Sequence, residues 1–394
     1  MPRSPRKPLG FRRGPRIADL MTRDYLAFVE SSQAAERTGD AATALEYHQG
    51  VPMFVRGAHR IVLAQLTDLA EEMTPWLWAR WVAYQCTRYE ECGTRAGEVN
   101  RFARDYTVRM FHSERVGQAY VDGEDPVPFL AQVAGEDWAF HQLCTYELGG
   151  LEAYLDTVAA GRLAEESVLA REWVRARMGA YRFESSGPGG LVVRELVSGC
   201  TRTLLDLGGC SGMEPGDFML GRLVPSGTTP ALMFDTRPLP VDEQTARETA
   251  AGTERGAWVA ALDHAFRDGR LDRSILLRED RELVTDVPSL ELVQRFTAPS
   301  ALASTMAQLA AGRDEVGRAA YRILRRAAEG TLGDNEMTAY VAAAVVSPAG
   351  FAEARRQLVD PHHAAAWERW AALVPEPARG RLELLAELSA ARAA

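Results

Sequence analysis

Apolar residues recur at helical spacing through the first 180 residues of the chain. Val62, Leu66, Leu69 and Met73 follow one another three or four positions apart, which places them on one face of a helix. The same pattern, with its turn and cap residues, predicts helices at residues 17–37, 41–49, 75–93, 95–112, 127–134, 136–148, 150–160 and 163–180. Because the connections are short, we expect an antiparallel stack of helical hairpins over residues 17–180.

The pattern changes between residues 181 and 240, where glycine and proline become frequent and β-favouring runs appear. Residues 191–197 and 201–207 flank Ser198-Gly199 and are typical of a β-hairpin. Residues 218–224 and 231–234 are further candidate strands. Several short strands in so short a segment indicate a small open barrel or a β-meander. We therefore expect a small β module at residues 181–240.

Helical patterns return after residue 240. The candidate helices are residues 243–268, 289–296, 299–311, 313–329, 334–346, 349–358, 361–373 and 377–392. Asp360 and Pro361 form a strong helix start, with aspartate as the N-cap and proline at the first helical position. Residues 274–286 are ambiguous and fit a short strand pair. The expected fold is mostly α, a helical-hairpin stack with an inserted small β module and a C-terminal helical domain at residues 241–394.

Two segments resemble known kinds of protein. Residues 34–48 read AAERTGDAATALEYH, and this string resembles the turn between the two helices of a tetratricopeptide repeat. The resemblance covers residues 20–54, one repeat unit, and implies a single helical hairpin, since no second copy follows at the repeat period. The strings RELVSG and PGDFMLGRLVP, within residues 181–240, are similar to small β modules of uncharacterised bacterial helical proteins. That similarity implies a fold and no activity.

The composition is that of a soluble globular protein. The chain has 394 residues, 46% hydrophobic and 25% charged, and a formal net charge of −9. Lys7 is its only lysine, so a P-loop, a kinase active site and a lysine Schiff base are excluded, and we expect no cofactor. The abundance of arginine and alanine is typical of bacteria with GC-rich genomes. The longest apolar stretch, residues 340–346, is far shorter than the roughly 20 residues of a membrane span. No secretory signal pattern is present, so we expect no membrane contact and a cytoplasmic location.

The first 16 residues form a basic, proline-rich tail that we expect to be disordered. Its charges could attract nucleic acid or an acidic partner. The alternative is a solvated chain end that binds nothing. The residues that would make such contacts are Arg3, Arg6, Lys7, Arg12, Arg13 and Arg16.

Metal chemistry has one candidate set, Cys86, Cys92, His141 and Cys144. His141 and Cys144 are three positions apart and share a helix face, whereas Cys86 and Cys92, six apart, do not. We therefore expect reduced, mostly buried thiols and no bound metal.

Glu90 and Glu91, next to Cys92, suggest acid–base chemistry. Adjacent carboxylates on a helix diverge by about 100° and do not form an acid–base pair alone. The alternative is a charged helix end before Gly93.

An aromatic stripe marks the helix that begins at Pro75. Tryptophan, tyrosine and arginine dominate interface hot spots, so this helix is a candidate for partner binding. The alternative is packing against neighbouring helices, and we expect Trp78 and Trp81 in the core with Trp76 at its edge. The candidate partner-binding residues are Trp76, Trp78, Arg80, Trp81, Tyr84 and Arg88.

These features leave three functional hypotheses. The leading one is a cytoplasmic protein-interaction or scaffold protein built on the helical stack, with a protein as partner. The alternatives are an uncharacterised enzyme with a histidine–carboxylate site in an interdomain cleft, and a nucleic-acid-associated regulator that acts through the basic tail. A concave cleft lined by buried histidine, glutamate and cysteine would favour the enzyme. A broad exposed groove of tryptophan, tyrosine and arginine would favour the interaction protein, and a helix-turn-helix with an arginine face would favour the regulator.

Overall fold

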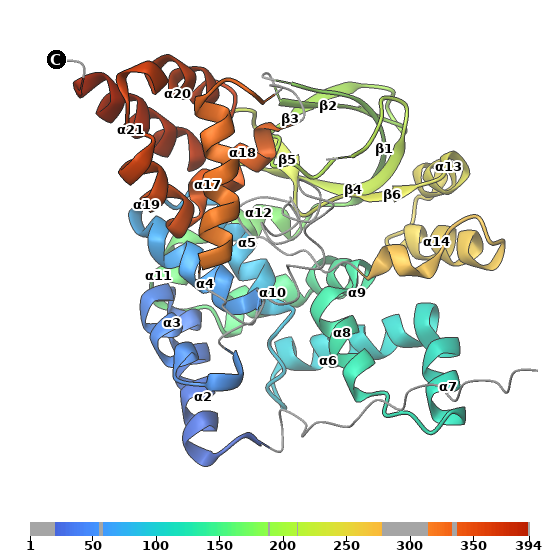
Figure 1. Cartoon of the computed structure of the whole chain (residues 1–394). Coiled ribbons are helices and arrows are strands. Elements are labelled where there is room, and N and C mark those ends of the chain that lie inside the picture. The colour runs from blue at the N-terminus through green and yellow to red at the C-terminus, as the bar shows by residue number, and fades with distance from the viewer. Residues whose placement is uncertain are drawn as a thin grey trace, which may run out of the picture.

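Helices form both ends of the described chain, and a curled antiparallel sheet lies between them in sequence (Figure 1). The computed structural model describes residues 20–54, 58–187, 190–210, 212–277, 314–332 and 337–392. The fold is mostly α with an inserted β module, as the sequence predicts. The basic tail at residues 1–16 and the predicted helices 289–296 and 299–311 lie outside the described residues.

The chain opens with a helical hairpin whose turn is encoded locally. Helix α2 (Arg23–Thr38) ends at Gly39, which adopts the left-handed conformation with φ of 81°. The Asp40 carboxylate then accepts a hydrogen bond from the Thr43 amide (2.9 Å) and caps α3 (Ala41–Gln49). The predicted turn is confirmed here. The helix predicted from residue 17 begins, within the described residues, at its Thr22 cap.

Further helices complete the N-terminal stack. They are η1 (Pro52–Phe54), α4 (Ala58–Leu69), η2 (Ala70–Glu72), α5 (Pro75–Cys86), α6 (Arg95–Thr107), the π-helix η3 (Val108–His112), α7 (Ser113–Val121), α8 (Val127–Glu136), α9 (Trp138–Gln142), the π-helix η4 (Leu143–Glu147), α10 (Gly150–Thr157), α11 (Gly161–Glu166) and α12 (Val168–Trp173). Two predicted ends are wrong. The helix expected to reach Gly93 ends at Cys86, and the one expected to reach residue 180 gives way to a strand at Met178.

The sheet has the strand order β3-β2-β1-β4-β5, with β6 also paired to β4. Its strands are β1 (Met178–Gly187), β2 (Gly190–Glu195), β3 (Thr201–Leu204), β4 (Phe218–Pro225), β5 (Leu232–Phe234) and β6 (Leu239–Val241). The predicted hairpin is confirmed as the antiparallel pair β2–β3. The Leu205 amide donates to the Leu232 carbonyl (2.8 Å), so the chain after β3 meets β5 and the sheet curls into a half-barrel.

The C-terminal part returns to helices. They are α13 (Glu243–Ala251), α14 (Ala257–Arg267), η5 (Arg273–Leu276), α17 (Asp314–Ala328), α18 (Thr338–Val346), α19 (Pro348–Gln357), η7 (Pro361–His363), α20 (Ala364–Ala371) and α21 (Ala378–Ala391). The helix predicted over 243–268 is two helices, because Gly252 is extended and Gly256 is left-handed with φ of 82°. Asp360 accepts from the His362 amide (2.9 Å), as its predicted capping role requires. Of the ambiguous segment 274–286, the described part holds η5 and an isolated bridge between Asp137 and Leu277.

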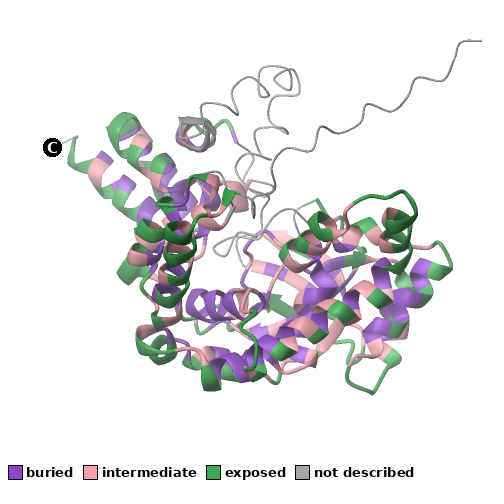
Figure 2. Cartoon of the chain, turned by 90° about the horizontal axis from the view of Figure 1, so that it is seen from below, coloured by how far each residue is buried: buried purple, intermediate pink, exposed green. Residues whose placement is uncertain are grey.

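Helix α5 lies at the centre of the core. It packs against α10, α11, α12 and η4, and its residues from Trp76 to Val82 are all buried. The expectation that Trp76 sits at the edge is therefore wrong, since neighbours cover every side of the helix and Trp76 is 0% exposed. One buried apolar cluster joins this helix to strand β4 and to the C-terminal helices, and Figure 2 shows the buried positions concentrated on the inward faces of the helices. The division into domains stays a prediction.

None of the described helices combines the length and apolar character needed to cross a bilayer.

Candidate functional site

A polar cleft of about 610 Å³ opens between α2, the end of α5 and α10. Its walls carry charged and aromatic side chains, and Glu36, Gln85 and Tyr154 are the buried ones among them. The volume suits a small molecule rather than a macromolecular surface. The full lining is Glu30, Gln33, Glu36, Arg37, Gln85, Arg88, Tyr89, Glu90, Glu91 and Tyr154.

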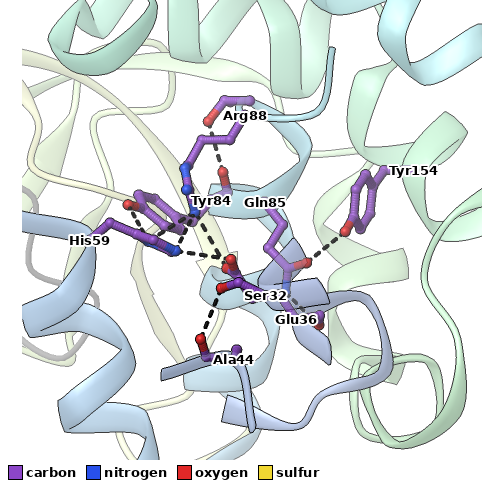
Figure 3. Close-up of polar contacts among 9 residues, drawn as sticks. Ser32, Glu36, Ala44, His59, Tyr84, Gln85, Arg88 and Tyr154 are labelled. Atoms are coloured by element: carbon purple, nitrogen blue, oxygen red, sulfur yellow. Dashed lines mark hydrogen bonds and ion pairs between the residues drawn. The ribbon is translucent and has the colours of Figure 1, made fainter. Parts of the chain in front are cut away.

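A buried carboxylate, Glu36 on α2, organises one wall of this cleft. Its side chain is 4% exposed, and its two oxygens have different partners. Oε1 lies 2.9 Å from His59 Nε2, and Oε2 accepts from Arg88 Nη1 at 3.3 Å (Figure 3). A carboxylate this deeply buried needs such compensation, because burial without partners disfavours its charged form.

His59, on α4, joins this carboxylate to a phenol. Its Nε2 faces Glu36 and its Nδ1 lies 3.1 Å from the Tyr84 hydroxyl on α5. Because Glu36 can only accept when ionised, we assign the imidazole proton to Nε2. Nδ1 then accepts a hydrogen bond from Tyr84. The result is a hydrogen-bonded line from Tyr84 through His59 to Glu36 (Figure 3).

Arg88 lies between this line and the cleft. Its Nη1 is 2.9 Å from His59 Nδ1 and 3.0 Å from Nε2, and its guanidinium carbon lies 5.0 Å from the centre of the Tyr84 ring. Its Nε and Nη2 have no hydrogen-bond partner among the described residues, and 32% of the side chain is exposed. Arg88 is thus anchored on one side and open to the cleft on the other.

The backbone that carries Arg88 is held from α6. The buried Asn100 side chain donates to the carbonyls of Thr87 (2.7 Å) and Cys86 (3.4 Å), at the end of α5. Thr94 caps α6 by accepting from the Gly97 amide (3.1 Å), and a Cβ at Gly97 would clash with the Glu91 carbonyl. The segment that bears Arg88 therefore has little freedom to move away from α6.

Two further contacts hold the helix that carries Glu36. The Gln85 amide donates to the Glu36 carbonyl (3.0 Å) and accepts from the Tyr154 hydroxyl (2.6 Å). The Ser32 hydroxyl, one turn earlier on α2, donates to the Ala44 carbonyl on α3 (2.9 Å). Figure 3 shows these bonds around the site, which draws on α2, α3, α4, α5 and α10. Its geometry is set before any ligand binds.

The charges of the site stabilise an ionised glutamate and neutral histidines. Burial alone would raise the pKa of Glu36, but the positive charge of Arg88 and the hydrogen bond of His59 outweigh it and lower that pKa. Burial and then the Arg88 charge lower the pKa of His59. Burial, followed by His59 and Arg88, lowers the pKa of His48, whose ring meets that of His59 edge-on at 5.0 Å, to about 4. Near neutral pH Glu36 therefore carries a negative charge beside the positive charge of Arg88.

The predicted partner-binding residues separate into two groups. Trp76, Trp78 and Trp81 are at most 3% exposed, and Arg80 is buried and donates to the Phe234 carbonyl (3.0 Å). These placements correspond to the packing alternative for the aromatic stripe. Tyr84 and Arg88 instead belong to the site described above. The six basic residues of the tail lie outside the described residues.

The other candidates occupy different positions. Cys86 and Cys144 are buried in the core, whereas Cys92 is exposed and accepts from Arg101 (3.3 Å). Within the described part of the chain no group of three or more histidine, cysteine or acidic side chains is placed to hold a metal ion. Glu90 and Glu91 follow α5 in a loop and line the cleft.

Sequence reasoning missed Glu36 and His59. Glu36 belongs to the string that resembles a tetratricopeptide repeat, where it occupies the buried face of α2 with Ser32 and Ala35. A glutamate on an apolar helix face is the signal that could have identified it, because ionisable residues are rarely buried without a partner. His59 has no comparable signal. Comparisons with protein-family models, with curated proteins and with solved structures find no match to this chain.

Proposed function

We propose that this protein is a binding protein that takes a small molecule with an oxyanion group, a carboxylate, sulfate or phosphate, into the cleft at Arg88. The observation that carries the proposal is the position of Arg88, with Nη1 engaged by Glu36 and His59 while Nε and Nη2 lack partners among the described residues. A guanidinium offers its N–H groups in a planar fork that matches an oxyanion in two-point geometry.

Preorganisation supports this role. An arginine side chain loses rotamer freedom when it binds a ligand, and that loss weakens binding. Arg88 is already held by Glu36 at 3.3 Å and by the face of the Tyr84 ring at 5.0 Å. Most of the rotamer entropy of Arg88 is therefore lost when the protein folds. Less is lost when a ligand binds, so the ligand binds more tightly than it would to a freely rotating arginine.

The other charged groups of the cleft are mixed, one guanidinium on Arg37 and the carboxyl groups of Glu30, Glu90 and Glu91. Arg37 brings a second guanidinium, which lies 5.3 Å from the centre of the Tyr89 ring, is 32% exposed, and has its Nη1 3.9 Å from Glu91 Oε2. The carboxylates that follow α5 already have partners, since Glu90 accepts from Arg104 (2.6 Å) and Glu91 from the Tyr89 hydroxyl (2.7 Å). These pairs reduce the repulsion that a bound anion would meet.

Calorimetric titration with sulfate, and with a panel of small carboxylates and phosphate esters, tests the proposal. We expect at least one of these anions to bind the native chain, and Arg88→Gln to weaken that binding tenfold or more, by about 1.4 kcal/mol or more. Arg247→Gln on α13, whose side chain is 73% exposed, is the matched control and should bind as the native chain does. Equal binding by Arg88→Gln and the native chain would refute the proposal.

A second candidate function is an enzyme with a histidine–carboxylate site. The specific observation is the line from Tyr84 through neutral His59 to ionised Glu36, in which a base oriented by a carboxylate accepts from a hydroxyl. Tyr84→Phe would abolish turnover in that case and leave anion binding intact.

The protein-interaction role and the cytoplasmic location expected from the sequence stay predictions. An acidic side chain of a protein partner would meet the same Arg88, and Tyr84 would lie beneath it.

A further inference from the structure

Arg88, His59 and Glu36 form one electrostatic unit. Arg88 Nη1 lies 2.9 and 3.0 Å from the two ring nitrogens of His59 and 3.3 Å from Glu36 Oε2, while His59 Nε2 lies 2.9 Å from Glu36 Oε1. Each pair of these three groups is in contact. A change of charge on one of them therefore acts on the other two at close range and with little screening, because Glu36 and His59 are 4% and 12% exposed.

We propose that the oxyanion binds together with one proton, which His59 takes up from solvent as the anion engages Arg88. This inference rests on the proposed function. It adds that binding at the cleft is coupled to pH.

The charge of Arg88 now disfavours a second proton on His59, whereas Glu36 favours one. An oxyanion on the open edge of Arg88 would offset its positive charge, and the guanidinium, while keeping its contact with Glu36, would shift away from the His59 ring. His59 would then face mainly the carboxylate, and an imidazolium beside a carboxylate is a stable pair. Binding of the anion thus offsets the charge that, after burial, most strongly lowers the pKa of His59.

The protons balance within the hydrogen-bonded line. His59 Nε2 keeps its proton toward Glu36, at 2.9 Å. The added proton goes to Nδ1, which at present accepts from the Tyr84 hydroxyl at 3.1 Å. A hydroxyl group can donate or accept, so the Tyr84 O–H rotates and its oxygen accepts from the new N–H. No covalent bond other than those to the transferred proton changes.

The remaining groups around His59 allow this change. From α3, His48 meets its ring at 5.0 Å, and burial keeps that imidazole neutral. The neighbouring Arg60 on α4 contributes a positive charge that is felt by His48. From α2 and α5, the groups in contact are Glu36, Tyr84 and Arg88. Of these groups Glu36 and Arg88 line the cleft, and Arg88 is the positive one that an anion there would meet.

The consequence is an affinity that rises as pH falls. When one proton is taken up with each anion, the association constant increases by up to about tenfold for each unit of pH. Sulfate is the suitable probe, because it does not titrate between about pH 5.5 and about pH 7.5, where an ordinary histidine does. Any pH dependence of its binding therefore reports protons on the protein.

The experiment is calorimetric titration of the native chain with sulfate at several pH values, in two buffers of different ionisation enthalpy. The difference between the buffers gives the number of protons taken up, which we expect to approach one per sulfate. His59→Gln should still bind sulfate but lose the proton uptake, because an amide can face both Glu36 and Arg88 without titrating. His264→Gln is the matched control, since His264 is 60% exposed on α14 and should leave the uptake unchanged.

The outcomes separate the two proposals. Sulfate binding that depends on Arg88 but takes up no proton overturns this inference and leaves the proposed function standing. Absence of binding by sulfate and by every other anion of the panel, or binding that Arg88→Gln does not weaken, overturns both. If His59→Gln does not fold, histidine-selective NMR of the native chain decides the matter, because a buried imidazole signal must shift to its protonated position when sulfate is added.

Discussion

Replacing Arg222 by methionine should destabilise the protein strongly, because this arginine is a buried charge at the junction of the sheet and the helices. It lies on β4, its side chain is 1% exposed, and it forms an ion pair with Glu147 at the end of η4. Its Nε donates to the Gln142 side chain (2.6 Å) and its Nη1 to the Ala176 carbonyl (2.7 Å). Methionine keeps the length and apolar stem of the side chain and removes all three of these polar contacts.

The magnitude follows from the partners that are left behind. Removing one member of a buried ion pair costs about 3–5 kcal/mol. Glu147 keeps the Trp258 indole N–H at 2.8 Å and Arg255 at 3.2 Å, so its charge is not left bare. We therefore expect a loss at the lower end, about 3 kcal/mol. Replacing both partners, in Arg222→Met with Glu147→Leu, should recover part of it, because apolar pairs often substitute for buried ion pairs without loss.

Urea denaturation followed by tryptophan fluorescence and circular dichroism measures this loss. Arg202→Met on β3 is the matched control, since its side chain is 47% exposed and lies 3.6 Å from Glu195. Exposed pairs of this kind contribute about 0–1 kcal/mol. If Arg222→Met were no more destabilising than Arg202→Met, the ion pair would not be the buried junction that we describe.

Three further predictions concern the core, pH and the tail. Trp81→Ala should cost about 3–5 kcal/mol in the same urea assay, because Trp81 is 0% exposed in the core; unchanged stability would contradict that placement. Burial lowers the pKa of His48 to about 4, so the folded state binds fewer protons than the unfolded state, and stability should fall as pH drops from about 6.5 toward 4. His48→Gln should remove about 1 kcal/mol of the difference in unfolding free energy between pH 7 and pH 5, a value reduced for solvent screening; an unchanged pH profile would count against a neutral His48. Deleting residues 1–16 should leave the melting temperature nearly unchanged, and a loss above about 1–2 kcal/mol would show that the tail packs on the body.

The helix boundaries that the sequence predicted well are those encoded within a few residues. Gly39 and Asp40 end one helix and cap the next, because glycine adopts a left-handed conformation freely and an aspartate oxygen reaches an amide three residues on. Asp360 with Pro361, and Pro75 at the start of α5, work in the same local way. The β2–β3 hairpin was predicted from two β-favouring runs on either side of the short turn at Ser198-Gly199.

Strand β1 shows what such local signals omit. The first part of β1 pairs with β4, some 40 residues later, through the register Met178 to Arg222. The residues of a segment do not encode which distant segment it pairs with, and the sequence predicted a helix up to residue 180. The predicted edge position of Trp76 was wrong for a related reason. The exposure of Trp76 depends on how many helices surround α5 rather than on the sequence pattern of α5 itself.

The candidate site was decided by tertiary structure almost entirely. Tyr84 and Arg88 attracted attention as aromatic and basic residues on one helix, but their partners are Glu36 and His59, which are 52 and 29 residues from Arg88. Polar side chains at such separations meet only when their helices pack. The sequence by itself determined most of the described helices and several of their caps. Which charges face one another, and which edge of Arg88 is left open to the cleft, depends on the packing of α2, α4 and α5, because an ion pair is specified by distance in space and not by spacing along the chain.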